Sequence, residues 1–398
     1  MSSVTPIQGK APNPMVRAVV GWQANRISDP VARLHFLRRT VGDLSTWNPV
    51  SAAGRNHLRS HPGRLVAALG AMLLLPAGAI TGSGFLWNRH PIVNGTVGTA
   101  EASSASSVWA VEQNKDFETY SNGLRIERRY ETGNEARTYD VYPRGFEDSG
   151  RAETRTMPAG IVFHTTESPQ AEFKEDQTRR IRLIGAALLD YVRNERAYHY
   201  LVDRFGRVWR IVRETDSANH AGYSVWADAE WTYISLNRAF LGISVEALTQ
   251  PGTDRSEATP AQLTALRALT EMLRAKYRIP VTNCATHAQV SVNPDNMQAG
   301  YHYDWAANFP YAGIGLPNNY SLPTPSLWLF GFTYDTSLVR VTGEQFWKGL
   351  ALGEEQLRQN ATAHGMSVPQ YREALFKRYR KVLSTFKAKT EKSKENIG

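Results

Sequence analysis

Residues 159–166 read AGIVFHTT, and this short run decides how the rest of the chain is interpreted. It carries no formal charge and is rich in apolar residues, which predicts a buried strand. The strand ends on His164 and so brings an imidazole to the edge of a sheet. One histidine at a strand end is more often structural than functional, so its chemistry depends on what else the chain brings there.

The segments that follow alternate between helical and extended patterns. Residues 177–196 repeat apolar side chains at helical spacing, and residues 197–212, AYHYLVDRFGRVWRIV, predict a hairpin with a glycine turn. Residues 241–248, LGISVEAL, predict another buried strand. A long helix is predicted to begin at Thr259 and the proline after it. We therefore expect an α/β fold, a mixed central β-sheet flanked by helices.

A second histidine, His287, follows the long helix in the segment NCATHAQ. Two histidines alone do not make a site, because a catalytic zinc takes about three protein ligands and an open position for water. The segment NPDNMQAGYHYDW supplies three candidates for the third ligand, namely Asp295, His302 and Asp304. The residue types permit a zinc site and leave the third ligand open.

Six segments in a fixed order carry a family resemblance. They are HTTES, AYHYLVDRFGRVWRIV, SANHAG, LGISVEAL, TPAQLTALRALTEMLRAKY and ATHAQVSVNP. Together they resemble the type-2 N-acetylmuramoyl-L-alanine amidases, the family that includes peptidoglycan recognition proteins and phage amidase lysozymes. The resemblance covers residues 155–312 and implies a mixed sheet flanked by helices with one zinc ion in a groove.

The resemblance implies that His164 and His287 are the first two zinc ligands. The family usually has an aspartate or cysteine as the third ligand, with a lysine shortly before it, and this chain has no lysine in residues 285–310. The segment DWAANFPY resembles the region just beyond the family's third ligand and so favours His302. Asp295, which has a fitting spacing, and Asp304 remain alternatives.

The resemblance also implies candidates for catalysis. Tyr198, which opens the hairpin, is expected to stabilise the oxyanion with help from His220 in the segment NHAG. Ser244 stands at a position where the family often has an acidic residue, and Glu246, two residues on, lies on the same face of the strand. Glu246 is expected to act as general base or to hold a metal ligand.

Three aromatic residues follow His220 and are expected in a loop that lines a glycan groove, Tyr223, Trp226 and Trp231. The expected reaction is zinc-dependent hydrolysis of the amide bond between N-acetylmuramic acid and L-alanine in peptidoglycan. Because the third ligand departs from the family pattern, two alternatives stay open. One is a peptidoglycan-binding module without catalysis, and the other is a membrane-anchored tether to the wall.

The N-terminal part predicts a membrane anchor. Residues 65–87, LVAALGAMLLLPAGAITGSGFLW, contain no charged residue and are long enough to cross a bilayer. Residues 1–64 form a basic arm, which the positive-inside tendency keeps in the cytoplasm. Residues 88–154 read as a linker and a short β region. The expected location is the bacterial inner membrane, crossed once, with the catalytic domain on the outer, periplasmic side.

The net charge limits the classes of binding partner, and the cysteine count limits the disulfides. The formal net charge is +9, but much of it lies in the first 64 residues and the last 30, so no nucleic-acid partner is expected for the central domain. The one cysteine, Cys284, cannot form an intramolecular disulfide and is expected in the core.

Residues 313–398 are expected to form a C-terminal extension that is mostly helical. Within it, residues 326–341 predict one or two strands or an extended wrap. Residues 342–386 predict helix with a break at residues 364–369. The basic tail is expected to end in a disordered polar segment.

Overall fold

A computed structural model describes residues 107–144, 152–249 and 258–395. The predicted membrane span at residues 65–87 and the basic arm before it lie outside these ranges. Within them, no helix has the length and apolar character that crossing a bilayer requires. The anchor therefore stays a prediction.

The central sheet has eight strands in the order β1-β2-β3-β8-β7-β11-β6-β12. Strands β7, β11, β6 and β12 are mutually parallel, and the strands beyond them include antiparallel pairs. The predicted mixed sheet is confirmed. The strands are β1 (Ala110–Gln113), β2 (Phe117–Tyr120), β3 (Arg125–Glu127), β6 (Gly160–Thr165), β7 (Tyr200–Val202), β8 (Val208–Arg210), β11 (Phe240–Val245) and β12 (Cys284–Thr286).

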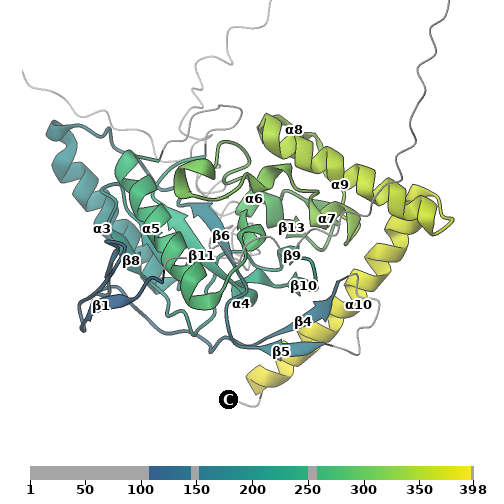
Figure 1. The fold of residues 1–398 in the computed structure, drawn as a ribbon, viewed down its shortest axis with the longest axis horizontal. Coiled ribbons are helices and arrows are strands. Elements are labelled where there is room, and N and C mark those ends of the chain that lie inside the picture. The colour runs from purple at the N-terminus through teal and green to yellow at the C-terminus, as the bar shows by residue number, and fades with distance from the viewer. Residues whose placement is uncertain (1–106, 145–151, 250–257, 396–398) are drawn as a thin grey trace, which may run out of the picture. The chain divides into compact units, whose positions relative to one another are not determined.

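Two long helices cover opposite faces of this sheet (Figure 1). Helix α5 (Pro260–Tyr277) packs its leucines against one face, in a core shared with Phe163 and Ile243. Helix α3 (Thr178–Asn194) packs against the other face, in a core shared with Leu201. Because side chains alternate along a strand, His164 points to the face that α3 covers.

Local sequence chemistry explains these elements. Thr259 and Gln262 form a capping box at the start of α5, with hydrogen bonds of 3.2 and 2.9 Å between each side chain and the other's backbone. The predicted β7–β8 hairpin is confirmed. Its turn uses Gly206 at φ +78°, where a Cβ atom would lie 2.6 Å from the carbonyl oxygen of Ala261.

Smaller elements surround the central sheet. A second sheet has the order β5-β4-β10-β9, and β13 and β14 form a short hairpin. These strands are β4 (Tyr139–Pro143), β5 (Glu153–Arg155), β9 (Val225–Ala227), β10 (Trp231–Ile234), β13 (Val292–Asn293) and β14 (Gln298–Ala299). The short helices are α4 (Leu236–Ala239), α6 (His287–Val290), η3 (Glu175–Gln177), η4 (Val281–Asn283), η5 (Ala312–Ile314) and η6 (Asn319–Ser321).

The C-terminal part is helical throughout its regular elements. They are α7 (Pro325–Trp328), α8 (Thr336–Val341), α9 (Glu344–Ala363) and α10 (Val368–Glu395). The strands predicted for residues 326–341 were wrong. Asp335 caps α8 by accepting hydrogen bonds of 2.8 and 3.2 Å from the backbone of Ser337 and Leu338, which outweighs the β propensity of the segment.

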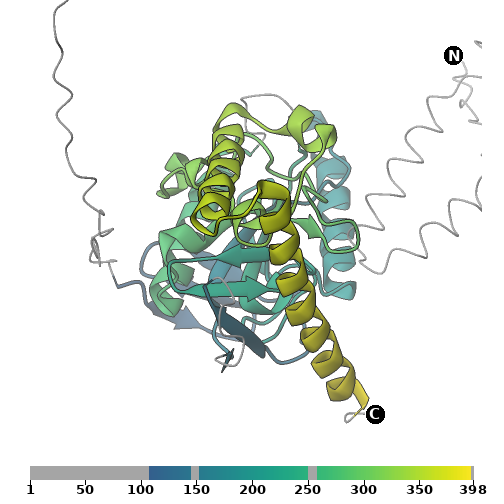
Figure 2. The ribbon, with the colours of Figure 1, turned by 90° about the vertical axis from the view of Figure 1, so that its right-hand side faces the viewer.

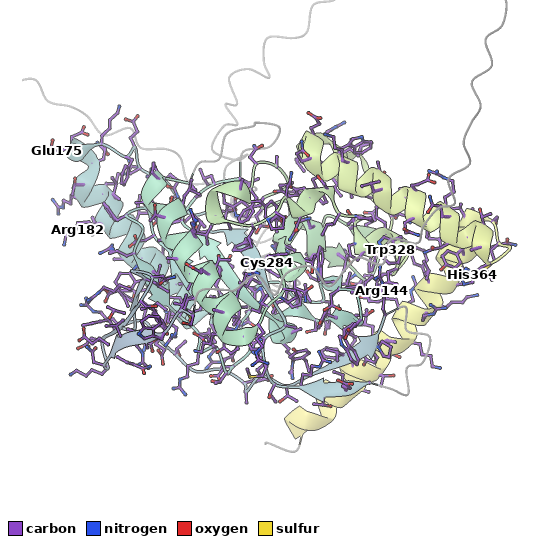
Figure 3. The ribbon with its side chains drawn as sticks, viewed as in Figure 1. Arg144, Glu175, Arg182, Cys284, Trp328 and His364 are labelled. Carbon is purple, nitrogen blue, oxygen red and sulfur yellow. The ribbon has the colours of Figure 1, made fainter. Side chains whose placement is uncertain are left out.

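The predicted helix break is confirmed, and α10 continues to Glu395, so the predicted disordered end was wrong for the residues up to there. Figure 2 shows α10 running past the sheets to the C-terminal end of the chain. Tyr379 and Phe386 of this helix belong to the same core as α5. Cys284, labelled in Figure 3, is buried and free, as expected. Arg144 lies 5.0 Å from the ring of Trp328 and links β4 to α7 (Figure 3).

Candidate active site

The parallel register brings His164 and His287 together. Thr286 on β12 pairs with Phe163 on β6, and the two strands are parallel. His287 and His164 each follow directly after one of these paired residues, so the two histidines lie side by side. Their ring centroids lie 4.4 Å apart. Both histidines lie at the carboxyl ends of parallel strands, the edge where open α/β sheets usually bind ligands.

Asp304, in the loop after β14, completes this pair. Its Oδ2 lies 3.1 Å from Nδ1 of His164, and its Oδ1 lies 2.8 Å from Nδ1 of His287. The three residues are the only group of histidine, cysteine, aspartate and glutamate in the described ranges whose ligand atoms converge in this way, all within 4.8 Å. All three side chains are buried.

The electrostatics of this group favour a cation. Burial alone would raise the pKa of Asp304, but His287 and His164 outweigh it and hold that pKa well below its usual value. The carboxylate is therefore ionised and faces two imidazoles. Nε2 of His287 is buried and has no hydrogen-bond partner among the described residues, which is uncommon for a cluster with a purely structural role.

The structure brings Asp304, rather than His302, into this group. The ring of His302 stacks on that of His287 at 4.6 Å between centroids and 21° between planes, so it lies beside the group and is not part of it. Asp295 lies in the exposed turn between β13 and β14, where its backbone amide binds the side chain of Asn293. The converging group therefore contains Asp304, one of the three candidates for the third ligand, and does not contain His302, the candidate that the sequence favoured.

His220 lies behind His164. Its Nδ1 is 3.1 Å from Nε2 of His164, and its Nε2 is 3.3 Å from the carbonyl oxygen of Phe240. Burial and the neighbouring His164 hold the pKa of His220 well below its usual value, so its ring is neutral. Both ring nitrogens face protein atoms, so neither is left to donate to a substrate oxyanion, the role expected from the sequence.

Tyr198 lies on another side of His164, with ring centroids 5.0 Å apart. Its backbone has φ +63°, a conformation that costs energy in a residue other than glycine and that often occurs at functional sites. Tyr198 is buried and packs beside Leu201. The structure thus brings this predicted residue to the group.

Glu246 extends the same face of the sheet. Ser244 pairs in register with His164, and Glu246 is two residues further along, which keeps it on that face. Its Oε2 accepts a hydrogen bond of 3.1 Å from the backbone amide of Arg204. Burial raises the pKa of Glu246 to about 7. A carboxyl group with a pKa near neutrality suits proton transfer.

Of the three aromatic residues expected in a loop after His220, only Tyr223 lies in a turn, and the other two lie in strands. Trp226 is buried in β9, and Trp231 begins β10 with the guanidinium of Arg155 4.3 Å from its ring. Tyr223 is 40% exposed, and its ring packs edge-on against Phe386 of α10. Tyr223 is therefore the most exposed of the three rings, and Trp231 is half-buried.

Three residues near His220 were not predicted from the sequence. They are His199, Asn237 and Gly242. The side-chain oxygen of Asn237 accepts from the backbone amides of residues 220, 221 and 222 at 2.9, 2.7 and 2.9 Å. Nδ1 of His199 accepts from the amide of Gly242 at 2.9 Å. Only the glycine had a signal, because a glycine inside an apolar strand often marks a close approach.

Residues 154–305 match the family described as N-acetylmuramoyl-L-alanine amidase. Among solved structures, an amidase, LysC, from Clostridium intestinale is 20% identical, and the match covers 48% of this chain and 93% of that one with a TM-score of 0.26. The Escherichia coli amidase AmiD, bound to an anhydro-muramyl peptide, is 19% identical, with 54% and 96% covered and a TM-score of 0.32.

A third similar structure is AmpDh3 from Pseudomonas aeruginosa, which is 18% identical, with 56% and 92% covered and a TM-score of 0.31. No curated protein matches the chain. With identities near 20% and such TM-scores, only the family match bears on function.

Proposed function

Because residues 154–305 match the N-acetylmuramoyl-L-alanine amidase family, we propose that the protein hydrolyses the amide bond between N-acetylmuramic acid and L-alanine in peptidoglycan. The reaction would use one zinc ion held by His164, His287 and Asp304. The observation that carries this proposal is the convergence of two imidazoles and one ionised carboxylate at the carboxyl ends of β6 and β12.

The donor set fits zinc. Neutral imidazole nitrogen and carboxylate oxygen are both ligands that zinc prefers, and three protein ligands leave a position for water or substrate, as in catalytic sites. When bound, the ion polarises the amide carbonyl and lowers the pKa of water toward neutrality. The other tasks, proton transfer and charge stabilisation, belong to side chains of the protein.

Glu246 is our candidate for proton transfer. Its Oε2 is held by the backbone amide of Arg204, which leaves Oε1 to take a proton from the attacking water. Cleavage breaks the carbon–nitrogen bond and leaves a lactyl carboxylate and a free amino terminus on L-alanine. The leaving amine needs one proton, and a carboxyl group with a pKa of about 7 is able to return the one it took.

Tyr198 is our candidate for stabilising the oxyanion. A tyrosine hydroxyl is a suitable donor, and the ring lies beside His164. Residues 285–310 contain no lysine to take this role. The unusual backbone conformation of Tyr198 supports the assignment. A hydrogen-bond donor that is already in place stabilises the developing charge without reorganisation.

We also propose that residues 65–87 anchor the chain in the bacterial inner membrane with the amidase domain outside. The support is the uncharged run of sequence and the basic residues before it. Fractionation, followed by protease treatment of intact spheroplasts, tests this. Protection of the domain from the protease, or its recovery in the soluble fraction, would overturn the location and leave the chemistry standing.

The full-length protein in detergent tests the activity. We expect about one zinc ion per chain and release of peptides beginning with L-alanine from purified sacculi, detected by mass spectrometry. Glu246→Gln and Tyr198→Phe should keep the zinc and lose most of the activity. Zinc-loaded protein that binds sacculi without releasing peptide would overturn the proposal and favour the binding module.

A further inference from the structure

Three hydrogen-bonding groups form a chain that ends at His164, one of the three residues of the converging group. The carbonyl oxygen of Phe240 faces Nε2 of His220 at 3.3 Å, and Nδ1 of His220 faces Nε2 of His164 at 3.1 Å. The remaining nitrogen of His164, Nδ1, faces Asp304. His220 is therefore the link between a fixed backbone carbonyl and a side chain that the proposed function assigns as a zinc ligand.

The carbonyl at one end sets which nitrogen of His220 carries the hydrogen. A carbonyl oxygen only accepts, so Nε2 of His220 must carry the hydrogen in this contact. The neutral ring then has a bare Nδ1, which accepts the hydrogen from Nε2 of His164. A neutral His164 then has its lone pair on Nδ1, which faces the ionised Asp304 at 3.1 Å, so both atoms are acceptors, as two ligands of one metal ion must be. The opposite tautomer of His220 would leave two lone pairs facing each other at Phe240.

The protein holds His220 from three directions. Asn237 fixes the backbone by accepting from three successive amides, of which the first belongs to His220. Gly242 gives the ring its space, since a Cβ atom there would lie 2.5 Å from Cγ and 2.8 Å from Nδ1 of His220. The amide of Gly242 is itself held by His199, whose ring is edge-on to that of His220 at 5.6 Å.

We propose that His220 is a positioning residue that fixes the tautomer and ring orientation of His164, with Gly242 and Asn237 keeping His220 in place. It does not contact substrate in this role. A zinc-binding histidine whose other nitrogen is hydrogen-bonded is oriented before the metal arrives, and the loss of such a partner typically costs about 10–100-fold in metal affinity. The inference deepens the proposed function and rests on it for the identity of the metal.

Metal affinity in the full-length protein tests the inference. Zinc binding is measured by competition with a chelator of known affinity. His220→Ala and His220→Gln should weaken binding by about 10–100-fold, because neither has an acceptor in the place of Nδ1. His220→Asn should lose clearly less, because its side-chain oxygen takes that place. Equal affinity in wild type and His220→Ala, or equal losses in the asparagine and glutamine variants, would overturn the inference.

A second variant avoids any change at position 220. Gly242→Ala should push the ring of His220 aside and weaken zinc binding to a similar extent. Gly185→Ala is its control, because the new methyl group on α3 would meet only Oε2 of Glu246, at 4.0 Å, and should leave affinity unchanged. Wild-type affinity in a folded Gly242→Ala protein would count against the inference.

Nitrogen NMR of the metal-free, histidine-labelled protein separates this inference from the proposed function. We expect the hydrogen of His164 on Nε2 in wild type and a mixture of tautomers in His220→Ala. A wild-type protein that shows this tautomer but binds no zinc would overturn the proposed function and leave the positioning role supported. Hydrogen on Nδ1 of His164 with none on Nε2, in the metal-free wild type, would overturn the positioning role.

Discussion

Two buried polar clusters lie on opposite faces of the central sheet and differ in how their charges are matched. On the α5 face, Arg210 binds Glu118 through two hydrogen bonds of 2.7 Å and also contacts Glu214 at 3.2 Å. Lys276 of α5 binds the other oxygen of Glu214 at 2.6 Å. Arg128 and Glu131 add a further ion pair at the edge of this cluster, so each charged group has a partner of opposite charge.

The cluster on the α3 face has no such balance. Its single carboxylate, Asp304, faces two imidazoles, and a third imidazole, His220, stands behind them. The buried Nε2 of His287 has no hydrogen-bond partner among the described residues. Asp304 forms ion pairs with His164 and His287 and with no lysine or arginine of the described residues. A cluster in which lysine and arginine already meet each carboxylate offers no free ligand to a metal ion, whereas two imidazoles and one carboxylate that converge are suited to hold one.

The sharpest way to break this comparison is to remove the one carboxylate of the α3-face cluster. Asp304→Ala should abolish zinc binding at micromolar concentrations and lower amidase activity by at least about 10³-fold, or about 4 kcal/mol of transition-state stabilisation. Zinc content after dialysis and peptide release from sacculi measure the two effects. The protein should stay folded, because the balanced cluster on the other face is untouched.

His302→Ala and Asp295→Ala are the matched controls. Both residues were candidates for the third ligand, and both lie outside the converging group, so each variant should keep its zinc. If His302→Ala loses the metal while Asp304→Ala retains it, the sequence-based expectation was right and the contacts of Asp304 are structural.

The sequence predicted His164 and His287 because each follows a regular strand, where alternation and length determine the place of a side chain. It could not decide between His302 and Asp304, because both lie in an irregular loop in which the directions of the side chains follow no regular period. Gly300 and Trp305 have φ +78° and +57°, which reverses the direction in which neighbouring side chains point. The sequence identified His220 as a candidate, but its role depends on a carbonyl and a glycine of β11.

The second prediction breaks the balanced cluster on the α5 face. Arg210→Met leaves Glu118 and Glu214 buried without their main cation and should lower the free energy of unfolding by about 3–5 kcal/mol at pH 7. Urea unfolding monitored by circular dichroism measures it. Protein that remains folded at low urea should bind zinc like wild type, because the α3-face cluster does not share these groups.

The loss should shrink at low pH, and the sign follows from Glu118. Burial raises the pKa of Glu118, but Arg210 outweighs burial and lowers it to about 2. Wild type therefore gains stability from this carboxylate above pH 4.5 and loses it as the pH falls toward 2. Lys276→Met is the control, since Arg210 still meets Glu214, and it should cost about 1 kcal/mol or less. Equal losses in the two variants would contradict the prediction.

The third prediction concerns Glu246, which shares the face of the unbalanced cluster. Burial raises its pKa to about 7 from the usual 4.5, so the folded state holds a proton that the unfolded state has already released. Stability should therefore fall as the pH rises from about 4.5 to 7, by up to about 3 kcal/mol from this group. Glu246→Gln should remove that part of the pH dependence in urea unfolding.

Activity gives an independent reading of the same group. In wild type, the rate at saturating substrate should rise with pH through about 7, as the carboxylate that takes the proton forms. A pH profile of stability that is the same in Glu246→Gln and wild type would mean that Glu246 is ionised in the folded protein at neutral pH. Its place as proton acceptor would then rest on geometry alone.

The smallest expected effect tests where the unbalanced cluster ends. Ser244 pairs in register with His164, stands where the sequence resemblance predicts an acidic residue, and has a buried hydroxyl with no hydrogen-bond partner in the described ranges. An unsatisfied buried hydroxyl destabilises, so Ser244→Ala should be neutral or stabilising by about 1 kcal/mol. Zinc affinity and peptide release should not change. A clear loss of either would show that the hydroxyl contributes to the site, and that the cluster on the α3 face extends from His164 to β11.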